Sequence, residues 1–109
     1  MIKVKELMTL ERLLLEINAK FKFELNFNDA YKLYEHLKSV GRITDYAFLL
    51  QDEFHKKFND KDKLKEYHET IINSNVEFET KDIIQFIEYV NEMIKNENFN
   101  KLIQEIKFW

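Results

Sequence analysis

Hydrophobic residues in the first part of this chain recur mostly every three or four positions, the period of an amphipathic helix. The first stripe consists of Leu7, Leu10, Leu14, Ile17 and Phe21. Thr9 has a side chain suited to an N-cap and Glu11 follows in the first turn, so we predict a helix at about residues 9–20. Residues 2–5 alternate apolar and basic side chains, which predicts a short, half-buried strand.

The period changes to two in residues 21–27, where every odd position is apolar. The apolar side chains are Phe21, Phe23, Leu25 and Phe27. Strict alternation is typical of an extended segment with one apolar face. We therefore predict a strand here, or an apolar connector that lies across the helices.

A long helical pattern follows, with Asn28 as its expected N-cap and Asp29 in its first turn. Its stripe shifts slightly in phase near Gly41, the only glycine of the chain. One continuous helix over residues 29–58 is favoured, because an internal glycine costs only about 1 kcal/mol. A hinge or kink at Gly41 stays the alternative.

Shorter elements are expected after this helix. The pattern predicts a helix at about residues 62–73 and a second short strand at 76–80. If that strand pairs with residues 2–5, the lysines of the first strand face Glu77 and Glu79, a favourable arrangement of charges. Thr80 is then the expected cap of a further helix, whose inner stripe is Ile83, Ile87, Val90 and Ile94.

The last segment carries another amphipathic stripe and ends in two aromatic residues. This spacing is typical of a helix that binds in a partner's groove, so we predict a partner-binding segment. Its expected contact residues are Phe99, Leu102, Ile103, Ile106, Phe108 and Trp109. The alternative is that the segment folds back and completes the core of its own chain.

These patterns together predict a mainly α-helical protein. The chain of 109 residues has one glycine and no proline, which favours helices over a β-sandwich or a fold with glycine-rich loops. We expect a single α-rich domain over residues 1–109, in which residues 95–109 form a separate amphipathic C-terminal helix. A long central helix packs against shorter ones, beside a minor two-stranded antiparallel β element.

Charge and composition restrict the cellular compartments and the classes of partner that we expect. The formal net charge is −3, and the acidic excess lies in residues 71–109. A nucleic-acid partner is therefore not expected, because such binding depends on a basic surface. No cysteine is present, which excludes disulfides and thiolate metal sites. No apolar run approaches the ~20 residues of a membrane span, and no signal peptide is visible, so we expect a soluble, cytoplasmic protein.

Candidate chemical sites are weak. His36, His55 and His68 lack the spacing that puts two metal ligands on one helix face, and Asp52 with His55 is expected to form part of a solvated face. The lysines of residues 56–65 alternate with acidic residues, as in a solvated connector. The aspartates near residue 60 lack the glycine of a calcium loop. Neither of the two serines has a catalytic neighbourhood. We predict no enzyme activity, no cofactor, no metal and no small-molecule ligand.

The aromatic content is the one feature that points to a function. Ten Phe, five Tyr and one Trp are more than a small core hides easily, and aromatic residues dominate protein–protein contacts. We therefore predict a protein–protein interaction module that binds a protein partner or self-associates. The alternative is a small acidic inhibitor of a host defence or nucleic-acid enzyme, comparable to an anti-CRISPR protein, acting through acids of the last third. Those acids are Glu77, Glu79, Glu88 and Glu92.

Five stretches of residues 2–80 carry a resemblance: Ile2–Leu7, the leucines at 13–15, Ala30–Leu33, the charged helix to Phe58 and Asn75–Glu79. The resemblance is to small helical proteins, mostly uncharacterised, that are encoded by tailed bacteriophages. It implies a phage accessory or virion-associated structural subunit, and it transfers no functional residues. Residues 81–109 lie outside it.

Overall fold

One long helix, α2 (Phe27–Lys57), sets the dimensions of the molecule. Its 31 residues rise 1.5 Å each and reach about 46 Å, and the molecule measures 47 × 26 × 24 Å. The structure, a computed structural model, describes residues 1–95 and 97–107. The remaining elements are β1 (Ile2–Lys3), α1 (Val4–Phe21), the 3₁₀ turn η1 (Lys22–Glu24), α3 (Lys61–Ile72), β2 (Asn75–Val76), α4 (Lys81–Ile94) and α5 (Glu97–Lys107).

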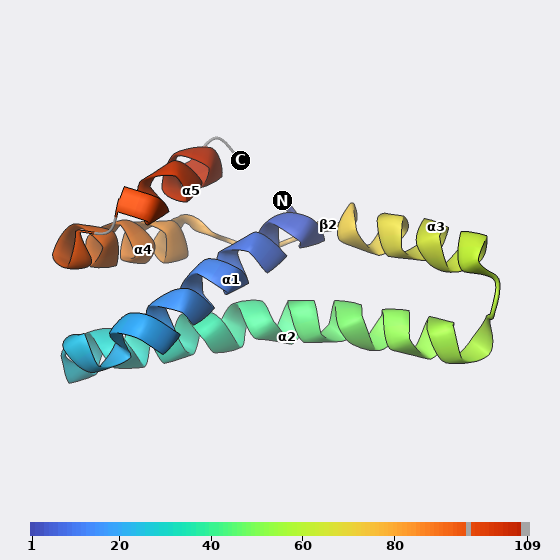
Figure 1. Ribbon diagram of the computed structural model, residues 1–109, viewed down its shortest axis with the longest axis horizontal. Coiled ribbons are helices and arrows are strands. Elements are labelled where there is room, and N and C mark those ends of the chain that lie inside the picture. The colour runs from blue at the N-terminus through green and yellow to red at the C-terminus, as the bar shows by residue number, and fades with distance from the viewer. Residues whose placement is uncertain (96, 108–109) are drawn as a thin grey trace.

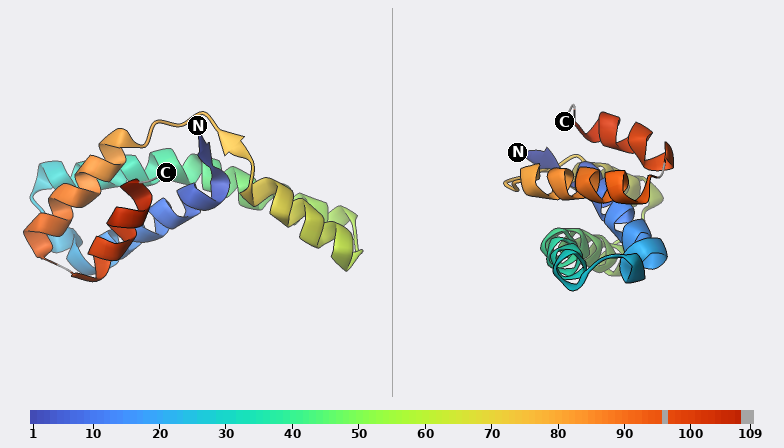
Figure 2. Two further views of the ribbon diagram at one scale, coloured as in Figure 1. Left: turned by 90° about the horizontal axis from the view of Figure 1, so that it is seen from above. Right: turned by 90° about the vertical axis from the view of Figure 1, so that its left-hand side faces the viewer.

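The other helices are distributed along α2. Figure 1 shows α1 crossing the first half of α2, while α3 runs back beside the second half. The helices α4 and α5 stack beyond α1, as the right-hand view of Figure 2 shows. No other element lies below α2 in the view of Figure 1. The expected class, a mainly helical domain with a two-stranded antiparallel sheet, is confirmed.

The hydrophobic core is built around α1, which contributes side chains along its whole length. Its buried residues are Val4, Leu7, Leu10, Leu13, Leu14 and Ile17. From the other helices the core receives Leu33, Val40, Ile83, Phe86, Ile87, Val90, Phe99, Ile103 and Ile106. The stripes predicted for the first helix and for the helix after Thr80 are therefore confirmed as core faces.

The start of α1 differs from the sequence prediction. The helix begins at Val4, so Thr9 is not an N-cap but an interior residue whose hydroxyl donates to the carbonyl of Lys5 at 3.2 Å. The backbone N–H of Lys3 donates instead to the Glu6 carboxylate at 3.1 Å. An acidic side chain three residues into the helix thus caps an end that carries no Ser, Thr, Asp or Asn.

The two-stranded sheet is shorter than predicted. Ile2 pairs with Val76 and Lys3 with Asn75 in antiparallel register. The expected contacts between the lysines of residues 2–5 and Glu77 and Glu79 are therefore wrong. The helix begins at Val4, which takes Lys5 out of the strand and leaves Lys3 opposite an asparagine.

The extended segment predicted at residues 21–27 is also wrong. Residues 22–24 form the 3₁₀ turn, and α2 begins at Phe27. Leu25 is buried, but Phe23 and Phe27 are 95% and 82% exposed, so the alternating residues do not share one buried face. Asn26, rather than Asn28, caps α2 by accepting a hydrogen bond from the backbone N–H of Asp29 at 2.9 Å.

Helix α2 continues through Gly41 without a break, which confirms the favoured alternative. At this point α1 and α2 are joined by a side-chain hydrogen bond, in which the fully buried Thr44 hydroxyl donates to Glu11 Oε2 at 2.7 Å. A Cβ on Gly41 would lie 3.5 Å from the same carboxylate oxygen, an ordinary van der Waals distance.

Replacing Thr44 with valine should lower the free energy of unfolding by about 1–3 kcal/mol. Valine fills the same space but leaves the Glu11 carboxylate without its partner. Urea titration followed by circular dichroism measures the change, and Thr44→Ser, which keeps the hydroxyl, serves as the control. A Val variant as stable as the parent chain would show that the hydrogen bond contributes nothing.

Gly41→Ala should raise the free energy of unfolding by up to about 1 kcal/mol, because alanine is the better helix former and the site has room for a methyl group. The same titration measures it. A loss of stability would mean that the close approach of Glu11 requires a glycine.

Candidate interaction surface

Three aromatic side chains are exposed together near the start of α2. Phe27, Tyr31 and Tyr34 are 82%, 53% and 51% exposed. The rings of Phe27 and Tyr31 are stacked, with centroids 6.5 Å apart and an interplanar angle of 12°. Tyr31 and Tyr34 follow at 6.3 Å and 37°, and Lys38 Nζ lies 5.1 Å from the centroid of the Tyr34 ring. The result is a continuous aromatic row on the surface.

The helical period places this row away from the core. Spacings of four and three residues keep side chains on one face of a helix. At 100° per residue, that face lies opposite the buried face of α2, which carries Asp29, Leu33, Val40, Thr44 and Ala47. Helix α2 therefore has an apolar inner face and an aromatic patch on its outer face.

The outer face continues with charged and apolar residues at the same spacing. We call the whole set the outer stripe: Phe27, Tyr31, Tyr34, Lys38, Arg42, Asp45, Leu49, Asp52 and Lys56. All nine side chains are exposed. Two neighbours of the stripe, Tyr46 and Phe48, are 60% and 55% exposed. The outer stripe thus runs along nearly the full length of α2.

Electrostatic contacts on the stripe differ between its ends and its centre. Asp52 and Lys56 form an ion pair at 3.1 Å. The pKa of Tyr31 is raised, chiefly because its hydroxyl is hydrogen-bonded to the Glu35 carboxylate. Within the described ranges, no ion pair engages Lys38, Arg42 or Asp45. The centre of the stripe therefore presents charges that no ion pair among the described residues neutralises.

The predicted partner-binding segment lies elsewhere. Phe99, Ile103 and Ile106 of α5 are 2%, 5% and 2% exposed and belong to the core of their own chain, and Leu102 is half-buried. The arrangement corresponds to the alternative that the sequence left open, a segment that folds back. Phe108 and Trp109 lie outside the described residues, and a partner-binding role of this segment stays a prediction.

The arm formed by α3 and the end of α2 is held by aromatic contacts. Phe54 stacks on Tyr67 with centroids 4.1 Å apart and contacts Phe58 at 4.5 Å. Lys57 and Lys63 lie over the Phe58 ring at 5.8 and 5.6 Å. Two lysines of the basic run thus cover an aromatic ring of their own chain.

A polar cavity of about 440 Å³ lies between α2 and α4. It is lined by Lys32, His36, Asp82, Gln85, Phe86 and Tyr89. The Tyr89 hydroxyl donates to the buried carboxylate of Asp29 at 2.9 Å, and this contact raises the pKa of Tyr89. The His36 ring lies 5.2 Å from that of Phe86. These groups tie α2 to α4.

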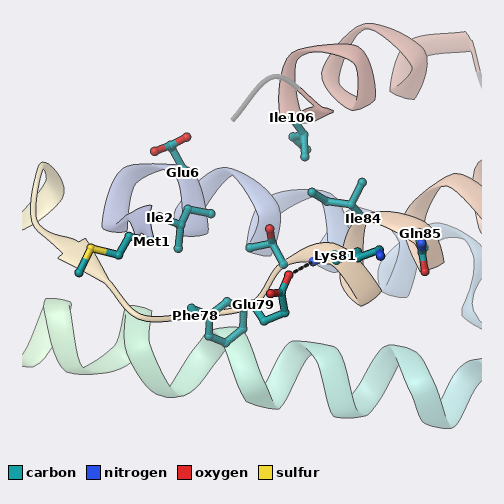
Figure 3. Close-up of a pocket in the computed structure, with 10 residues that line it drawn as sticks. Met1, Ile2, Glu6, Phe78, Glu79, Lys81, Ile84, Gln85 and Ile106 are labelled. Atoms are coloured by element: carbon teal, nitrogen blue, oxygen red, sulfur yellow. Dashed lines mark hydrogen bonds between the residues drawn. The ribbon is translucent and has the colours of Figure 1, made fainter.

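A second cavity, of about 430 Å³, lies beside the sheet. Figure 3 shows its lining side chains, which come from the first two residues, α1, the segment before α4, α4 itself and α5. Two of its carboxylates already serve backbone groups: Glu6 accepts from Lys3 N–H, and Glu79 accepts from the N–H of Lys81 at 3.1 Å. We therefore interpret both as helix-capping groups.

The three histidines and the acidic residues near them form no common cluster among the described residues. Asp52 and His55 are both exposed, in line with the predicted solvated face. His68 Nδ1 lies 2.6 Å from Gln51 Oε1. Across residues 1–95 and 97–107, no three His, Asp or Glu side chains are grouped so that they could hold a metal ion. None of the described helices has the length and apolar character needed to cross a bilayer.

The outer stripe lies outside the contact residues that the sequence predicts. Those residues belong to the C-terminal segment, and Phe27 falls in the predicted extended segment. The signal was present in the spacing of Phe27, Tyr31 and Tyr34, which places them opposite Leu33 and Val40.

Comparison with known proteins gives no further guide to the site: the chain matches no family model, and neither a curated protein nor a solved structure is significantly similar to it. The resemblance to phage-encoded proteins stays a prediction.

The stability of the fold should depend on the protonation of His36. Burial lowers the pKa of His36 from its ordinary value of 6.5, against a smaller opposing effect of Asp82, so the folded chain binds fewer protons there than the unfolded chain. Stability should therefore be complete above pH 6.5 and decrease as the pH falls through the lowered pKa.

Urea titrations above and below this range measure the dependence. His36→Gln should flatten it, whereas His55→Gln, at an exposed position, should leave it unchanged. An identical pH profile for His36→Gln and the parent chain would contradict the assignment.

Proposed function

We propose that this protein is a non-enzymatic protein–protein interaction module, an accessory or structural subunit of a larger assembly, and that the outer stripe of α2 is its contact surface. The observation that carries the proposal is the aromatic row, in which Phe27, Tyr31 and Tyr34 stand next to one another at exposures above 50%. Exposed aromatic side chains in a cluster are a mark of interaction sites.

The composition of the stripe supports a protein partner. Tyr, Phe and Arg are enriched at protein interfaces, and charged residues beside an apolar centre provide specificity. The stripe also carries Asp45 and Asp52, and Glu35 adjoins it. These carboxylates disfavour a phosphate backbone, which requires a predominantly basic surface.

The rigidity of the platform also supports the proposal. The stripe lies on a continuous helix whose inner face is anchored to α1 by the Thr44–Glu11 hydrogen bond and by buried apolar side chains. An interface on such an element loses little conformational freedom on binding, which favours affinity. A phage origin, as the resemblance implies, accords with a small structural subunit and stays a prediction.

A photo-crosslinking amino acid that replaces Tyr34 should form covalent adducts with a second protein molecule. The adducts are sought in the purified protein and in extracts of the cells that express it. The same group at Glu66, exposed on α3, is the matched control. Replacing both Phe27 and Tyr31 with glutamine should abolish the adducts and change the free energy of unfolding by no more than about 0.5 kcal/mol, because both residues are exposed.

Adducts at both positions, or at neither, would contradict the proposed surface. Adducts at Tyr34 that persist in the Phe27→Gln/Tyr31→Gln variant would show that the aromatic row does not form the contact.

A further inference from the structure

We infer that the partner of the outer stripe is a second copy of this chain, bound antiparallel to the first about a two-fold axis that passes between residues 41 and 42 of α2. The inference rests on the proposed function and names its partner. It follows from the order of residues along the stripe, which is complementary to itself when reversed.

The charges at the centre of the stripe provide the first match. About this axis, Lys38 faces Asp45 of the second copy, and Asp45 faces Lys38. Both side chains are exposed, and neither forms an ion pair among the described residues. A two-fold axis repeats every contact, so one complementary pair in the sequence provides two in the dimer.

The flanking positions match in the same register. Tyr34 faces Leu49 of the second copy, two side chains that are 51% and 49% exposed. Phe27, at the exposed end of the aromatic row, faces Lys56, an aromatic ring opposite a cation. The apolar end of each stripe therefore covers the mixed end of the other. A parallel arrangement would place each of these residues opposite its own like, Lys38 against Lys38 and Asp45 against Asp45.

Arg42, the remaining charged residue at the centre of the stripe, lies next to the axis. Arg42 faces Gly41 of the second copy. The Glu11 carboxylate lies beside this position, with Oε2 3.5 Å from where a Cβ of Gly41 would stand. All nine side chains of the outer stripe are exposed, so a second copy can reach this face of α2.

Sedimentation equilibrium of the purified chain tests this inference. The parent chain should sediment with twice the 13.4 kDa of one copy. Lys38→Asp and Asp45→Lys should each weaken dimerisation by about tenfold or more, because each places like charges opposite one another. The double variant Lys38→Asp/Asp45→Lys should restore it. Lys65→Asp on α3 is the matched control and should have no effect.

Cross-linking tests the register directly, since the natural chain has no cysteine. In a mixture of Lys38→Cys and Asp45→Cys chains, a short bismaleimide should join the two different chains, and it should give far less product with Lys38→Cys alone. Preferential joining of two Lys38→Cys chains would indicate parallel pairing and overturn the inference.

The two proposals fail differently. A monomeric parent chain, or a dimer that both single charge reversals leave intact, overturns the second-copy assignment. If Tyr34 then still forms an adduct with another protein, the interaction module stands and its partner is a different chain. If Tyr34 forms no adduct at all, both proposals fall.

Discussion

The packing of α1 against α2 is the constraint on which the rest of the structure depends. Helix α1 buries six side chains, Val4, Leu7, Leu10, Leu13, Leu14 and Ile17. The buried Thr44 hydroxyl, held by Glu11 at 2.7 Å, joins the two helices at a polar point within this contact. Because burial of apolar surface dominates folding and a buried polar group must be satisfied, the two helices are fixed together in one alignment. The helices α4 and α5 then cover the other side of α1.

That packing divides α2 into a buried face and an exposed face. The inner face packs into the core, whereas all nine side chains of the outer stripe, from Phe27 to Lys56, are exposed. A helix that only supported the core would carry polar residues on its outer face. This one carries a row of exposed aromatic rings, an arrangement whose cost in solubility is offset when a partner covers it. The core-facing side and the proposed contact surface are therefore opposite faces of one helix.

Part of the candidate site could be predicted from sequence. The aromatic surplus and the interaction role that it indicates need only the composition. The location was missed, because the alternation of residues 21–27 favoured an extended segment, whereas Asn26 caps a helix that begins at Phe27. A local pattern of period two was overridden by helix capping. Conversely, Phe99, Ile103 and Ile106 have the spacing of a partner-binding helix, and only their burial shows that their own chain covers them.

The sequence by itself determined the helical class, the apolar stripes and the continuity of α2 through Gly41, because these follow from local periodicity and the near absence of glycine and proline. Tertiary structure alone decided which amphipathic face is covered. A stripe of apolar residues indicates that a helix buries one side, but it does not indicate which element covers that side. For α5 the answer is the core of its own chain, and for the outer stripe of α2 no described element provides it. Burial depends on which helices meet in space, and that is settled only when the whole chain packs.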